Sequence, residues 1–89
     1  MWRMTKMNKI LVEIYIPASE KTYDLFIPSH LMMYDVLKML CKMATEMCDG
    51  LFVSDENTII CNRADGSILN INLSVKELEL KNGSKLMLI

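Results

Sequence analysis

The chain has 89 residues, of which 52% are hydrophobic and 24% are charged, enough for one compact domain with one core. Ten basic and eleven acidic residues are mixed along the chain and give a formal charge of −1, so no basic patch for a phosphate backbone is present. These values argue against a nucleic-acid partner. Glu13 interrupts the first apolar stretch, so the sequence predicts no signal peptide or membrane span. We expect residues 1–6 to be a short extension and residues 7–89 to fold.

The first part of this domain has the pattern of a β-hairpin. Residues 10–16 and 22–27 alternate between two faces with a period of two, and residues 17–21 supply a polar break between them. One face of the hairpin should therefore be buried, and it carries Val12, Ile14 and Leu25.

An amphipathic helix should follow the hairpin. Pro28 lacks an amide donor and ends the second strand, Ser29 is the expected N-cap, and the apolar period changes from two to 3.6 as far as about Cys48. Asp49-Gly50 should end the helix, because glycine accepts the left-handed conformation found there. The expected apolar stripe comprises Met33, Val36, Leu37, Leu40, Ala44 and Met47.

The remainder of the chain predicts short elements separated by turns. Residues 58–62 and 67–71 read as strands on either side of turn residues. Ser74-Val75-Lys76-Glu77 matches a capping box and predicts a single helical turn, while Asn82-Gly83 leads into a last strand over residues 85–89. The order ββαββ(short turn)β predicts an α+β fold, a mixed sheet of four or five strands wrapped on one helix, which is the β-grasp.

The segment Ser74-Val75-Lys76-Glu77-Leu78-Glu79-Leu80-Lys81-Asn82-Gly83-Ser84-Lys85-Leu86 is similar to a ubiquitin-like pattern of capped turn, leucine pair, Asn/Asp-Gly turn and closing strand. The resemblance extends from about Met7 to Ile89, although Glu79 stands where many members have glycine. Within the ubiquitin-like proteins, the chain most resembles the YukD-type proteins of Gram-positive bacteria, called EsaB in staphylococci. The shared features are the short length, the early hairpin and an ending close to residues 82–89.

This resemblance implies a function. YukD-type proteins are small cytosolic accessories of the type VII secretion machinery, which handles helical WxG-type substrates, so we expect a cytoplasmic adaptor that docks on the soluble part of a membrane-anchored component. One alternative is a β-grasp scaffold or regulator of another system. A second alternative is a carrier protein whose Gly-Gly tail is missing from this sequence. The sequence ends at Leu88-Ile89, which predicts neither a conjugated modifier nor a sulfur carrier unless the chain is incomplete.

No residue pattern predicts an enzyme, a cofactor site or a metal site. His30 is the single histidine, and no spacing links it to a cysteine as a general base. Cys41, Cys48 and Cys61 are odd in number and form no CxxC pair, so we expect reduced, buried or half-buried thiols.

The outer face of the sheet is the expected protein-binding site. Ubiquitin-like proteins typically bind partners through this face, and a contiguous apolar patch there would be costly without a partner. The alternative is that scattered exposed apolar residues are normal in a monomer. The residues expected to point away from the helix are Leu11, Tyr15, Phe26, Ile60 and Met87.

Methionine is unusually frequent, with nine residues in the chain. Met32, Met39 and Met43 widen the apolar part of the predicted helix beyond one core stripe. Flexible core filling is the favoured interpretation. The alternative is an adaptable docking or self-association surface, to which methionine is suited.

Overall fold

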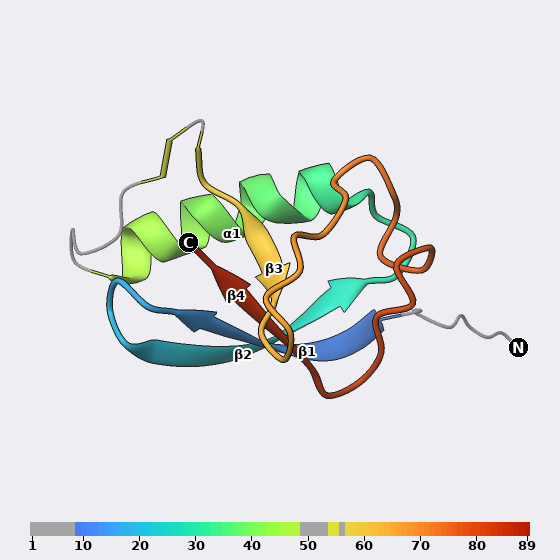
Figure 1. Cartoon of the computed structure of the whole chain (residues 1–89), viewed down its shortest axis with the longest axis horizontal. Coiled ribbons are helices and arrows are strands. Elements are labelled where there is room, and N and C mark those ends of the chain that lie inside the picture. The colour runs from blue at the N-terminus through green and yellow to red at the C-terminus, as the bar shows by residue number, and fades with distance from the viewer. Residues whose placement is uncertain (1–8, 49–53, 56) are drawn as a thin grey trace, which may run out of the picture.

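The computed structural model describes residues 9–48, 54–55 and 57–89 (Figure 1). The expected extension over residues 1–6 and the expected helix stop at Asp49-Gly50 lie outside these ranges. The helix lies across one face of the sheet (Figure 1). In chain order the elements are β1 (Lys9–Ile16), β2 (Lys21–Pro28), α1 (Met33–Met47), β3 (Ile60–Asn62) and β4 (Ser84–Leu88).

The sheet is mixed and has the strand order β2-β1-β4-β3. β1 pairs antiparallel with β2 through the predicted hairpin, and it pairs in parallel with β4 on its other side. β4 in turn pairs antiparallel with β3. The predicted α+β architecture, a mixed sheet on one helix, is confirmed.

Alternation along the strands puts one apolar face of the sheet against α1. Val12 and Ile14 of β1 are almost completely buried, and so are Leu86 and Leu88 of β4. From the helix, the buried residues are Met33, Val36, Leu40 and Ala44. Met47, by contrast, is 49% exposed, so its predicted core position is wrong. It is the last residue of α1.

The free backbone amides at the start of α1 donate hydrogen bonds to the backbone of a neighbouring loop, and not to a serine side chain. The helix begins at Met33 and has Met32 as its N-cap, without a side-chain capping bond. The amides of Met33 and Tyr34 donate to the carbonyl oxygens of Leu73 and Ile71, at 2.8 and 3.0 Å. Ser29 is therefore not the N-cap, because carbonyls distant in sequence accept from the first free amides.

The strands that follow the helix are shorter than predicted. β3 has three residues, and the predicted strand over residues 67–71 is reduced to one bridge between Cys61 and Ile68. The amide of Asn72 donates to the side-chain oxygen of Asn70 at 2.9 Å. Such an Asx turn redirects the backbone, so strand pairing cannot extend through residue 71.

The capping box and the turn after it form as predicted. Ser74 Oγ accepts from the Glu77 amide at 3.0 Å, and Glu77 Oε1 accepts from the Ser74 amide at 2.8 Å. Val75 is completely buried, and Leu78 and Leu80 pack against the core. Glu79 has a φ of +58°, a conformation that favours glycine.

Replacing Glu79 with glycine should stabilise the protein. A left-handed residue with a Cβ costs roughly 1–2 kcal/mol, and the added flexibility of the unfolded chain offsets about 0.4–1 kcal/mol of the gain. We therefore expect Glu79→Gly to raise the free energy of unfolding by about 0.5–1 kcal/mol, measured by urea denaturation. Glu77→Gly is the control and should destabilise, because it removes the capping carboxylate. A lower urea midpoint for Glu79→Gly would contradict the assigned strain.

Candidate protein-binding site

The outer face is the side of the sheet turned away from α1, and strand register arranges its residues in three rows. In the first row Tyr15 lies beside Met87, which lies opposite Cys61. In the third row Leu11 lies opposite Phe26. Apolar side chains therefore form two separate groups on this face.

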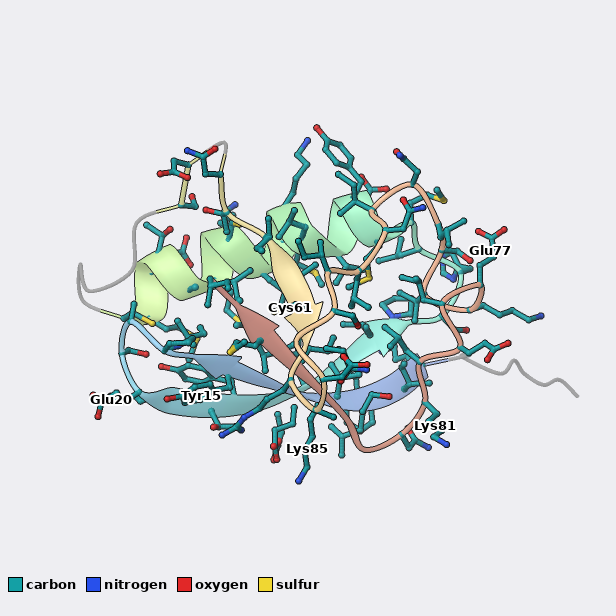
Figure 2. The ribbon with its side chains drawn as sticks, viewed as in Figure 1. Tyr15, Glu20, Cys61, Glu77, Lys81 and Lys85 are labelled. Carbon is teal, nitrogen blue, oxygen red and sulfur yellow. The ribbon has the colours of Figure 1, made fainter. Side chains whose placement is uncertain are left out.

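A row of charged residues lies between these two apolar groups. Asp24 is directly opposite Glu13, and Glu13 lies beside Lys85. Arg63 adjoins Lys85, because its amide donates to the Lys85 carbonyl at 3.0 Å. Figure 2 shows the Lys85 side chain directed away from α1. The row is acidic over β2 and β1 and basic over β4 and the residue after β3.

Arg63 connects the charged row with the first apolar row. Its guanidinium lies over the Tyr15 ring, 4.1 Å from the ring centre, and its Nη1 is 3.8 Å from Glu13 Oε2. Both charged side chains are about a third or more exposed, so water screens the ion pair and its stabilising effect is small. The contact mainly orients Arg63 and covers part of the tyrosine ring.

Four of the five predicted site residues are on the expected face. Phe26 and Leu11 are 62% and 37% exposed, while Tyr15 and Met87 are half-buried. Ile60 is 1% exposed and belongs to the core, so its prediction is wrong. The reason is register: Ile60 pairs with the inward-facing Leu88, and a shift of one residue exchanges the faces of a strand.

Sequence reasoning missed the charged row and the outward position of Cys61. Cys61 takes the place expected for Ile60, and it is itself buried at 2% exposure. The sequence did indicate that Glu13 and Lys85 point outward, because each of them adjoins a core residue in an alternating strand. Only the parallel pairing of β1 with β4 places them side by side.

The surroundings of two thiols disfavour their ionised form. Burial raises the pKa of the Cys41 thiol. Burial, and secondarily the Asp65 carboxylate, raise the pKa of the Cys61 thiol. All three cysteines are free, with Cys48 and Cys61 buried and Cys41 half-buried, as the sequence predicted. Thiolates are the nucleophilic form of cysteine, so these environments lower the reactivity of Cys41 and Cys61 at neutral pH.

Residues 9–48, 54–55 and 57–89 contain neither a cluster of metal-ligand side chains nor a membrane-spanning helix. Within these ranges, no three His, Cys, Asp or Glu side chains come together in a way that could hold a metal ion. No helix in the same part of the chain is long and apolar enough to cross a membrane.

The apolar residues of α1 outside its core stripe lie on two opposite flanks of the helix. Met32 and Met39 are 40% and 41% exposed, and Met43 is half-buried against the core. Met43 thus fits core filling, while the other two methionines contribute mainly to the surface. Tyr34 and Cys41 lie on the other flank of the helix, towards β3.

Comparison with known proteins supports the fold. No protein-family model matches the chain, and no curated protein sequence matches it. Among solved structures, the ubiquitin of Caldiarchaeum subterraneum is similar, with a TM-score of 0.71, 16% identity and 91% coverage of each chain.

Two further similar structures are ubiquitin-like domains, the first of them from a type VII secretion system protein. The domain of EccD1 from Mycobacterium tuberculosis has a TM-score of 0.65 and 17% identity, and the match covers 93% of this chain and 99% of that one. The EccD5 domain from Mycobacterium xenopi has a TM-score of 0.63 and 22% identity, with 91% and 92% coverage. The chain therefore has the ubiquitin-like β-grasp fold.

Matched lysine substitutions should distinguish the two strand faces. Ile60→Lys places a charge in the core and should lower the free energy of unfolding by more than about 3 kcal/mol, whereas Phe26→Lys should change it by about 1 kcal/mol or less. Urea denaturation followed by circular dichroism measures both values. If Ile60→Lys were as stable as Phe26→Lys, the register of β3 would be incorrect.

Thiol alkylation should respond to pH as burial requires. Because the folded state raises the pKa values of Cys41 and Cys61, iodoacetamide labelling of both should reach its half-maximal rate at a higher pH than in urea. The folded state disfavours the two thiolates, so the free energy of unfolding should also depend on pH. It should fall as pH rises from about 8.5, the pKa of an unfolded thiol, towards the higher pKa values of the folded state. Peptide mass spectrometry measures labelling at each cysteine. Faster labelling of the folded protein at neutral pH would refute this assignment.

Proposed function

We propose that this protein is a non-catalytic, cytoplasmic ubiquitin-like adaptor that docks on a soluble part of the type VII secretion machinery through its outer face. The observation that carries the docking proposal is the exposed combination of Phe26 and Leu11 with the charged row. Protein interfaces typically combine apolar anchors with a polar surround.

The charged row favours a partner surface with its own ordered charges. Asp24 and Glu13 are directly opposite in neighbouring strands, an arrangement that is destabilising for like charges. A basic partner group over β2 and β1 would relieve this repulsion, and an acidic group would pair with Lys85. Such a pattern contributes orientation and specificity more than affinity.

The type VII assignment rests on the sequence resemblance to YukD-type proteins and agrees with the fold shared with the EccD domains. A protein with this role would be peripheral to a membrane-anchored complex without inserting into the membrane itself. Scaffolding or regulation in another system is the second candidate, because the ubiquitin of Caldiarchaeum subterraneum has the same fold, with a TM-score of 0.71. Both candidates use the same outer face.

Affinity purification from the native host should test the assignment. The wild-type chain should retain components of the type VII machinery, and Phe26→Lys should reduce their recovery roughly tenfold, as expected for loss of an apolar anchor. Quantitative mass spectrometry measures the recovery. Glu46→Lys, an exposed change on α1 and therefore on the other side of the sheet from the outer face, is the control and should leave recovery unchanged.

Two results would contradict different parts of the proposal. Recovery of other proteins in place of secretion components, still sensitive to Phe26→Lys, would favour the scaffold of another system. Equal recovery by Phe26→Lys and the wild type would show that the outer face is not the docking surface.

A further inference from the structure

An apolar groove of about 630 Å³ lies between α1 and the chain segments around β3. It is separate from the outer face, because its lining comes from a flank of the helix and from the edge of the sheet. Tyr34, Leu37 and Cys41 of α1 form one wall, and Ile59, Ile68 and Ile71 contribute to the other.

The groove arises from the unequal lengths of the elements that form it. α1 has 15 residues and is therefore about 22 Å long. β3 has three residues, about 10 Å of strand, so the edge of the sheet cannot cover the full flank of the helix. Ile68 is 67% exposed and Tyr34 is 50% exposed as a result. Contiguous apolar surface of this kind usually marks an interaction site.

Charge along the rim indicates what kind of partner fits. Lys38 and Lys42 both line the groove and lie four residues apart on α1, so they are neighbours on its surface. Like charges at this spacing repel each other and weaken a helix. The Lys38 Nζ lies 5.2 Å from the centre of the Tyr34 ring, which keeps this cation close to the aromatic wall.

Within the described part of the chain, the acidic residue that lines the groove is Asp55. Asp55 belongs to the wall opposite the lysines, and its Oδ1 accepts the Asn57 amide at 2.8 Å. Among the residues that the structure describes, the charged groups of the lining are two cations on the α1 rim and one hydrogen-bonded anion across from them. An anionic group of a partner is therefore favoured beside the two lysines of α1 and disfavoured beside Asp55.

We infer that this groove binds an amphipathic helical segment of another protein, with an apolar stripe and carboxylates one turn apart beside it. The apolar stripe fills the space between Leu37 and Ile68. The two carboxylates pair with Lys38 and Lys42, because acidic residues four apart on a partner helix have the same spacing as the lysines. This inference does not depend on the proposed function, since it concerns a different surface.

Designed peptide libraries provide the test with the full chain. Each library uses a helical scaffold of about 18 residues, long enough to populate a helix, with stripe positions varied among Leu, Ile, Met and Phe. Two flanking positions, one turn apart, carry glutamate in one library and lysine in the other. Fluorescence polarisation should show that the tightest glutamate peptides bind roughly tenfold more strongly than the tightest lysine peptides.

Substitutions then locate the binding site. The double change Lys38→Glu and Lys42→Glu should reverse the preference between the two libraries, and it changes only exposed side chains. Ile68→Lys should weaken binding of the glutamate peptides by at least about tenfold. Met39→Lys is the matched control on the opposite flank of α1 and should change binding by less than about twofold.

Three outcomes would overturn the inference. The first is that neither library binds. The second is that both bind equally well, or that the charge reversal leaves the preference unchanged. The third is that Ile68→Lys has no effect while Met39→Lys abolishes binding, which would place the helix on the methionine flank.

Discussion

The pairing of β4 between β1 and β3 is the interaction on which the rest of this structure depends. β4 comes from the end of the sequence, yet it occupies an interior position in the sheet. Its Leu86 and Leu88 are completely buried. β3, with three residues, has β4 as its neighbour within the sheet. Without β4, β3 would lose its ladder and α1 would lose part of the apolar surface on which it packs.

The same pairing determines the composition of the outer face. Because Leu86 and Leu88 point into the core, alternation requires Lys85 and Met87 to point outward. Parallel register then sets Lys85 beside Glu13 and Met87 beside Tyr15. The charged row and the apolar rows on either side of it are therefore consequences of a core constraint. The contacts that hold the fold together therefore also fix the positions of the side chains that a partner on this face would contact.

Local patterns predicted much of the fold, and pairing between distant segments accounts for most of what they missed. The hairpin, the helix and the capping box at Ser74 could be predicted because their signals lie within a few residues. The inward position of Ile60 depends on register with β4, and the start of α1 depends on the carbonyls of Ile71 and Leu73, which sequence spacing does not reveal. Four of the five candidate outer-face residues came from strands with clear alternation, whereas Ile60 came from the short strand.

The outer face and the groove meet at β3. Ile60 lines the groove, whereas the next residue, Cys61, lies in the first row of the outer face. The two surfaces otherwise use different side chains, so a partner on one does not cover the other. Interiors of proteins are close-packed and deform little, so the shared strand β3 is the most direct route by which occupancy of one surface could influence the other. The hydrogen-bonded pairing of β3 with β4 opposes movement of this strand, which favours independent binding of two partners over coupled binding.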